Sequence, residues 1–331
     1  MGKKYLLPSK GRYYKANLHC HTVLSDGHLT AEEVKQAYME RGYSIVAFTD
    51  HRKYAWHREL DQEDFLAIAA YEVDINDFEK QAGDFSRLKT YHLNLYDTKP
   101  WENSQQKAAS ILPERRYTDI CSINGYIAKM REMGFLTCYN HPYWSLQTYD
   151  DYKDLRGLFA MEIYNHGCEH DGLYGFNPQA YDEMLRTGQR LHCVATDDNH
   201  NEYPFADPMC DSFGGFTMIK AERLDYGSIM AALERGDFYY SMGPELRDVF
   251  VEDGELVVKT SPVEKIFVVQ EGRHCYKKLA RPGETLTEAR FPLTGKEGYI
   301  RVQCRDGRGL HAGTNAYFID QIPAIFQSGC A

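Results

Sequence analysis

The chain has 331 residues, 43% of them hydrophobic and 26% charged, which is typical of a globular protein with one large domain or two. Its formal net charge of −10 argues against a general nucleic-acid binder, although metal cations in a cleft could still attract a phosphorylated substrate. The nine cysteines include no C-x-x-C pair, and the sequence has neither a signal-peptide pattern nor an apolar run of about 18 residues, so we expect a cytoplasmic protein with reduced thiols and no membrane span.

The first predicted strand ends in two histidines. An apolar segment over residues 13–18 predicts this strand, and the sequence His19-Cys20-His21 follows it. Because side chains i and i+2 of a strand point to the same side, His19 and His21 can bind one metal ion between them. Asp26, in the following Ser-Asp-Gly turn, can add an oxygen ligand. Imidazole and carboxylate together suit zinc, iron or manganese.

A helix and a second strand come next. Thr30 and Glu33 have the spacing of a capping box, which predicts the start of a helix, and Gly42 predicts its end. The apolar run over residues 45–48 is typical of a buried strand, and it leads into His51.

The same succession of helix, glycine, strand and polar residue recurs further along the chain. Predicted helices lie at residues 125–133, 178–187 and 225–234, and predicted strands at residues 135–139, 191–196 and 238–241. The first two of these strands lead into His141 and into Asp198 and His200. Strands that alternate with helices predict an α/β fold with a mostly parallel sheet, and such sheets carry their sites at the carboxyl ends of the strands.

Two further candidate metal ligands lie between these recurring segments, and an insertion follows them. Glu72 falls in the strand-like run 67–73, and His92 falls in an alternating segment over residues 90–96. Residues 97–122 break the rhythm with a polar stretch, and we expect this insertion to lie over the site.

The C-terminal part of the chain has a different pattern. Short strand signals at residues 256–258, 266–269, 291 and 299–305 are separated by glycine-containing turns, which predicts a small β-sandwich of roughly six strands. We place the boundary near Gly243 and Pro244, which gives a first domain over residues 1–244 and a β-sandwich-like accessory domain over residues 245–331. This accessory domain packs against the first domain, mediates homo-oligomer formation, or binds a sugar or protein; the sequence leaves these roles open.

In this order, the motifs over residues 12–243 resemble those of the PHP family, named for polymerase and histidinol phosphatase. The matching motifs are H-x-H (His19, His21), S-D-G (residues 25–27), T-D-H (residues 49–51), an E-V run at Glu72, H-L at His92, N-H-P at His141 and D-x-H (Asp198, His200). The C-terminal part resembles the small β domain of a two-domain subgroup of this family.

The resemblance implies a distorted (β/α)7 barrel with two to three divalent ions (zinc, iron or manganese) in a trinuclear centre. By similarity, the first ion is held by His19, His21, Glu72 and Asp198, the second by Glu72, His92 and His141, and the third by Asp26, His51 and His200. The D-x-H spacing of the family motif selects Asp198 as the ligand, and it leaves the preceding Asp197 as a partner that supports a ligand from behind or as a competitor for the metal.

The expected activity is metal-dependent hydrolysis of a phosphate ester, with a small phosphomonoester favoured. Metal ions can clamp two phosphate oxygens and lower the pKa of a bridging water, so that hydroxide attacks phosphorus and no protein nucleophile is required. We expect Glu72, Asp198 and His200 to act in catalysis through the metal ions. Two alternatives remain, namely an exonuclease or phosphodiesterase of the same family and a metal-stabilised binding module without catalysis.

A second set of residues is expected near the substrate or behind the ligands. The candidates for substrate binding are Arg52 and Lys53 after His51, Arg115 and Arg116 in the insertion, and His166 after the E-x-Y-N run at residues 162–165. For each of them a solvated loop is the alternative interpretation. We expect Asp50 to orient a ligating imidazole.

Overall fold

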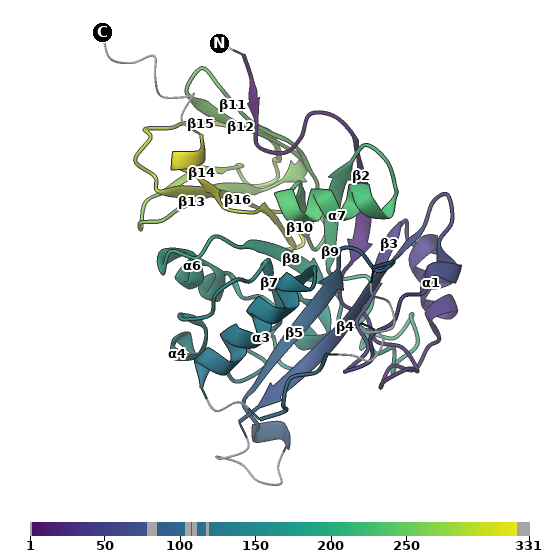
Figure 1. Ribbon diagram of the computed structural model, residues 1–331. Helices are drawn as coiled ribbons and strands as arrows, with labels where there is room; N and C mark the ends of the chain where they lie inside the picture. The colour runs from purple at the N-terminus through teal and green to yellow at the C-terminus, as the bar shows by residue number, and fades with distance from the viewer. Residues whose placement is uncertain (1, 78–84, 103–106, 108–110, 117–118, 323–331) are drawn as a thin grey trace.

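The computed structural model describes residues 2–77, 85–102, 107, 111–116 and 119–322 (Figure 1). Seven strands form the part of the large sheet that carries the candidate site. In hydrogen-bonded order they are β2 (Arg12–Asn17), β3 (Ile45–Phe48), β4 (Leu66–Asn76), β5 (Thr90–Asp97), β6 (Phe135–Tyr139), β7 (Ala160–Asn165) and β8 (His192–Thr196). The first three are parallel to one another and so are the last three, whereas β5 runs antiparallel to both of its neighbours.

The predicted closed barrel is not confirmed, because the sheet is open. Within the described part of the chain, β8 forms a backbone ladder with β7 alone, and β9 (Phe216–Ala221) continues the sheet from β2. The Thr217 hydroxyl of β9 bridges the gap to β8 by accepting from Ala195 N at 3.3 Å and donating to Ala195 O at 3.0 Å. A side chain therefore takes the place of the ladder that would close a barrel.

Helices cover this sheet, and their caps follow from the sequence. The longer ones are α1 (Ala31–Glu40), α3 (Ile120–Glu132), α6 (Pro178–Arg186) and α7 (Tyr226–Arg235); α4 (Tyr149–Tyr152) and α5 (His166–His170) are single turns. The capping box of α1 is present, since Thr30 Oγ1 accepts from Glu33 N and Glu33 accepts from Thr30 N. We predicted the start of α3 at residue 125, but Asp119 caps the helix and it begins at Ile120.

The C-terminal strands form two layers around a core of their own. A four-stranded sheet has the order β1 (Lys4–Tyr5), β11 (Leu246–Glu252), β12 (Glu255–Val263) and β15 (Leu286–Pro292), and β1 lies beside β11 at the top of Figure 1. The other layer contains β13 (Lys265–Gln270), β14 (Cys275–Leu279), β16 (Tyr299–Arg305), β17 (His311–Thr314) and β18 (Tyr317–Phe318). Val258, Val268 and Val302 are among the buried residues of this core.

The large sheet continues across the predicted domain boundary. Strand β10 (Phe238–Ser241) precedes Gly243, and it pairs with β9 on one side and with β17 on the other. The division at residue 244 therefore stays a prediction. Of the predicted insertion, residues 103–106, 108–110 and 117–118 lie outside the described residues, while residues 111–116 include Pro113, whose carbonyl accepts from Arg52. Among the described residues, no helix has both the length and the apolarity to cross a membrane.

Candidate metal centre

Nine side chains with metal-binding atoms converge at one edge of the sheet. They are His19 and His21 after β2, Asp26 in the next turn, His51 after β3, Glu72 in β4, His92 in β5, His141 after β6, and Asp198 and His200 after β8. The carboxyl ends of the parallel strands meet at this edge, and β5 begins there because it runs in the opposite direction. All nine belong to four overlapping groups, and within each group the ligand atoms lie within 4.8 Å of one another.

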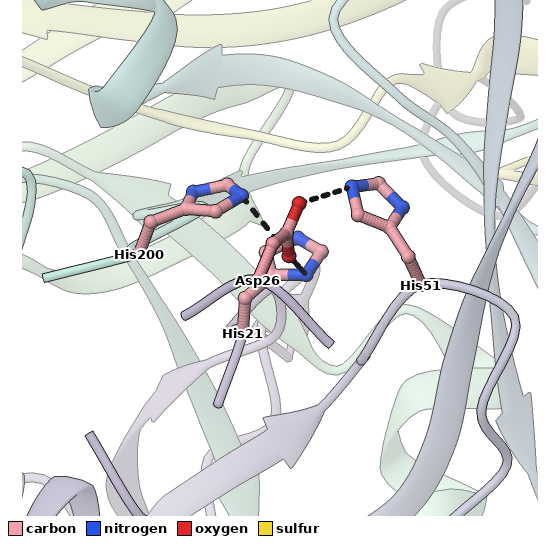
Figure 2. A group of neighbouring side chains, drawn as sticks. All are labelled: His21, Asp26, His51 and His200. Atoms are coloured by element: carbon pink, nitrogen blue, oxygen red, sulfur yellow. Dashed lines mark ion pairs between the residues drawn. The ribbon is translucent and has the colours of Figure 1, made fainter. Parts of the chain in front are cut away.

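The outer group surrounds the carboxylate of Asp26 (Figure 2). Asp26 Oδ1 lies 3.5 Å from His21 Nδ1 and 3.6 Å from His200 Nε2, and its Oδ2 lies 3.5 Å from His51 Nε2. The Asp26 side chain is 53% exposed, whereas His21 is buried. This group therefore forms the rim of the centre.

Glu72 occupies the middle of the cluster and is shared between groups. It lies opposite His51 in an isolated bridge just beyond the end of β3, and its side chain is buried. Its Oε2 is 3.0 Å from His51 Nδ1 and 3.4 Å from His19 Nε2, and its Oε1 is 2.9 Å from His92 Nδ1. Burial raises the pKa of Glu72, but His92 and the other imidazoles outweigh it and hold the pKa well below its ordinary value.

Asp198 lies among the imidazoles, and the neighbouring Asp197 does not. Asp198 Oδ1 is 3.0 Å from both His19 Nε2 and His21 Nε2, and its Oδ2 is 3.6 Å from His141 Nε2. Its φ of 54° is left-handed, which aspartate tolerates better than most residues. Asp197 instead accepts hydrogen bonds from the hydroxyl of Tyr38 and from backbone N–H groups of residues 213–215, which places it behind the cluster as an anchor for that loop.

The arrangement of donor atoms fits divalent metal ions. His19 Nε2 and His21 Nε2 face each other at 3.1 Å, close to the roughly 3.3 Å that separates ligands at a tetrahedral ion with bonds of about 2.0–2.1 Å. The buried His21 Nδ1 has no hydrogen-bond partner among the described residues. Burial, followed by His200, lowers the pKa of His21 to about 4, which keeps this imidazole neutral and able to donate a lone pair.

Glu162 is a functional candidate that the sequence reasoning missed. It is buried in β7, and its Oε1 lies 2.7 Å from His19 Nδ1 and accepts from Thr196 Oγ1 at 2.8 Å. Its Oε2 accepts from Asn165 Nδ2 at 2.9 Å and from His141 N at 3.3 Å. A carboxylate on the far nitrogen of a ligating imidazole fixes its tautomer and orientation. The available signal was the E-x-Y-N run, which we connected with substrate binding and not with the orientation of a metal ligand.

Asp50 holds a loop, where we had expected it to orient an imidazole. Its carboxylate accepts hydrogen bonds from Thr22 N at 2.8 Å, from Ser25 N at 3.2 Å and from Ser25 Oγ at 2.8 Å. These contacts fix the turn that presents Asp26. The partners of Asp50 are therefore backbone and hydroxyl groups of this turn, and a role in orienting an imidazole stays a prediction.

A cavity of about 330 Å³ opens onto the cluster. Its lining residues are Asp26, His51, Glu72, His92, His141, Trp144, Gly167, Cys168, His170, Asp171, Asp198, His200, Glu202, Tyr203, Met209 and Asp211. Among the described residues, no Arg or Lys lines it.

None of the five predicted substrate-binding residues lines this cavity. Two of them, Arg52 and Arg115, instead form ion pairs with the carboxylate of Asp74, at 3.3 Å and 3.5 Å. The backbone of Arg116 pairs with that of Asn76, and Lys53 is exposed in the loop after β3. His166 lies behind the cavity wall, where its ring contacts Tyr164 and His170.

Comparison with known proteins gives weak similarities. No protein-family model and no curated protein matches the chain. Among solved structures, it is similar to a two-domain protein from Bacteroides vulgatus described as containing a PHP-like metal-dependent phosphoesterase, with 14% identity, a TM-score of 0.46, and coverage of 94% of this chain and 98% of that one. It is also similar to a protein from Bifidobacterium adolescentis described as a metal-dependent phosphoesterase, with 16% identity, a TM-score of 0.38, and coverage of 70% of this chain and 98% of that one.

A third similar structure is an amidohydrolase from Chromobacterium violaceum with bound sulfate, with 14% identity, a TM-score of 0.37, and coverage of 59% of this chain and 93% of that one. Identities and TM-scores this low carry no functional conclusion. The functional inference below therefore depends on the side chains of the site.

Proposed function

We propose that the protein is a metal-dependent hydrolase of phosphate esters, with two to three divalent zinc, iron or manganese ions and a small phosphomonoester as substrate. The observation that carries this proposal is the convergence of six histidines and three carboxylates, all of which belong to groups with metal-binding spacing. Glu72 is shared between two of these groups, as expected of a carboxylate that bridges two ions. The nucleotide or phosphorylated metabolite would enter from the cavity.

The candidate ligands differ in burial, which separates an inner metal site from one near the surface. His19 and His21, both buried, would hold the inner ion with Glu72 and Asp198, while the exposed carboxylate of Asp26 would hold an ion at the rim. When bound, such ions polarise a phosphate ester and lower the pKa of a water molecule. Because no Arg or Lys among the described residues lines the cavity, the protein itself offers no cationic side chain to the phosphate there.

The cavity favours a small substrate over a polymer. Its volume of about 330 Å³ lies near the lower end of the roughly 300–1,000 Å³ that small-molecule pockets span. The formal net charge of −10 also disfavours a polyanion that would contact a wide area of the surface. A phosphodiesterase or exonuclease activity and a binding module without catalysis remain as outcomes of the test.

The test is phosphate release by the purified protein after chelation and add-back of manganese, zinc or iron. The substrates would be mononucleotides, nucleoside bisphosphates, sugar phosphates and histidinol phosphate. We expect metal-dependent release from one class, loss of metal and turnover in His19→Ala and Asp198→Ala, and no change in the control His274→Ala, an exposed histidine in the loop between β13 and β14. Full activity of His19→Ala would refute the proposal, and metal binding without release from any monoester would redirect it to diesters.

A further inference from the structure

His170 differs from every other histidine in the cavity wall. The cavity is lined by His51, His92, His141, His200 and His170, and of these only His170 belongs to none of the four metal-binding groups. An imidazole that faces the reaction space without a ligand role is a candidate for proton transfer, since imidazole exchanges protons near neutral pH.

The short helix α5 that carries His170 is attached directly to the metal centre. Asn165 at its start accepts from Cys168 N at 2.9 Å, and its amide group donates to Asp198 Oδ2 at 3.0 Å. Gly167 N donates to the carbonyl of Asp197 at 2.8 Å, and a Cβ at Gly167 would lie only 3.1 Å from the Asp198 carbonyl. The helix therefore packs against the ligand-bearing backbone, which fixes the position of His170 relative to the metal groups.

A chain of polar contacts holds the ring of His170 from behind. His170 Nε2 lies 3.3 Å from His166 Nε2, and His166 Nδ1 lies 2.9 Å from the Tyr164 hydroxyl. Gly214 makes room for this arrangement, because a Cβ there would lie 2.2 Å from the His166 ring. Burial, and to a smaller extent the neighbouring His170, lower the pKa of His166 to about 4. His166 is therefore neutral, and one of its ring nitrogens can accept a hydrogen bond.

These contacts leave one nitrogen of His170 available. Within the described part of the chain, Nδ1 of His170 has no hydrogen-bond partner, while Nε2 is occupied by His166. The leaving alkoxide of a phosphomonoester is a strong base and needs a proton as it departs. The described lining of the cavity contains no Lys or Arg that could supply it.

We propose that His170 is the general acid of the hydrolysis proposed above, on which this inference rests, and that Tyr164 and His166 are positioning residues. As the bond between phosphorus and the ester oxygen breaks, that oxygen takes the bonding electron pair and the proton from Nδ1 of His170. Water supplies the oxygen of the new bond to phosphorus and releases one proton to solvent, and His170 regains one proton from solvent. The other titratable groups that line the cavity outside the metal groups are Cys168, Asp171, Glu202, Tyr203 and Asp211.

The test compares two leaving groups in His170→Gln. A nucleoside monophosphate has an alkoxide leaving group that needs protonation, whereas p-nitrophenyl phosphate has one that departs without it. We expect kcat for the nucleoside monophosphate to fall by about 10²–10⁴-fold and kcat for p-nitrophenyl phosphate to stay close to wild type. Bound metal, measured by elemental analysis, should be unchanged, as should both activities in the control His274→Gln.

Two further measurements separate proton transfer from packing. In wild type, kcat for the nucleoside monophosphate should decline at alkaline pH, and His170→Gln should lose this decline. Added imidazole should restore activity to His170→Ala on the same substrate, and Tyr164→Phe should shift the alkaline limb without changing KM. An equal loss on both substrates, a loss of bound metal, or no loss at all would overturn the role of His170, whereas a wild-type protein that releases no phosphate would overturn the proposed function itself.

Discussion

The replacement Glu162→Gln tests whether the carboxylate behind the cluster controls metal binding. The carboxylate of Glu162 accepts on both oxygens, from His19 and Thr196 on one and from Asn165 and His141 on the other. A glutamine has one acceptor oxygen, so whichever way its amide is turned, an NH₂ group faces two donors. Removing the charge also leaves the imidazole of His19 less basic and less firmly oriented.

The expected loss of unfolding free energy in Glu162→Gln is set by the amide orientation that leaves fewer hydrogen bonds unsatisfied. The glutamine oxygen would keep His19, whose contact is short at 2.7 Å, and its NH₂ group would face Asn165 and His141 N. Of these, Asn165 retains its second acceptor on Asp198 at 3.0 Å, and the His141 contact is already long at 3.3 Å. We therefore expect the metal-free protein to lose about 1–3 kcal/mol of unfolding free energy, the cost of roughly one unsatisfied buried donor.

Metal affinity tests the role of Glu162 more directly than protein stability does. Loss of a carboxylate partner behind a ligating histidine typically weakens metal binding by about 10–100-fold. The assay is competition with a chelator of known affinity, on wild type, on Glu162→Gln and on the control Glu264→Gln, an exposed glutamate between β12 and β13. Unchanged metal affinity in Glu162→Gln would refute the assignment of Glu162 as the residue that positions His19.

Three further predictions use other parts of the chain. In Gly27→Ala, the new Cβ would lie about 2.5 Å from backbone atoms of the turn that precedes Asp26, so the protein should lose metal more readily on dialysis. The control Gly272→Ala, where a Cβ has nothing within 4 Å, should retain its metal. Asp182→Ala leaves the buried guanidinium of Arg301 without its partner at 2.7 Å, and urea unfolding should show a loss of about 3–5 kcal/mol; a loss below 1 kcal/mol would contradict this. Burial lowers the pKa of His192 to about 4, below its unfolded value of about 6.5, so its contribution to stability is present above pH 6.5 and lost as the pH falls towards 4. Between pH 7 and pH 5, wild type should therefore lose about 2 kcal/mol more unfolding free energy than His192→Asn. Parallel pH profiles of the two proteins would exclude this role of His192.

Several of the candidate ligands could be predicted from the sequence because their positions depend on local rules, whereas Glu72 and His92, which lie inside strands, were assigned through the family resemblance. Histidines two apart at a strand end share a side, and the residues after parallel strands meet at one edge of a sheet. The preference for Asp198 over Asp197 came from the D-x-H motif of the family resemblance, and in the structure Asp198 lies 3.0 Å from two imidazole nitrogens. These inferences need no knowledge of how distant segments pack.

The features that escaped prediction depend on tertiary contacts. Glu162 lies inside a strand, and its role is visible only in its contacts with His19, Thr196 and Asn165, which lie on other segments or further along the chain. The failure of the barrel to close depends on β9, an unpredicted strand that approaches β8 through the hydroxyl of Thr217. A count of helices and strands cannot distinguish such a side-chain bridge from a ladder.

The basic residues show most clearly why proximity in sequence failed as a guide to the substrate. Arg52 directly follows His51, yet its φ of 56° is left-handed and its guanidinium pairs with Asp74, outside the residues that line the cavity. In its described part, the cavity wall carries carboxylates and imidazoles and lacks a cationic Lys or Arg. A phosphate group would meet only negative or neutral protein groups there unless divalent ions or protonated imidazoles are present. For the proposed activity, metal binding and recognition of the anionic substrate would therefore be coupled, and this coupling would let an acidic protein act on a phosphate ester without a basic binding pocket.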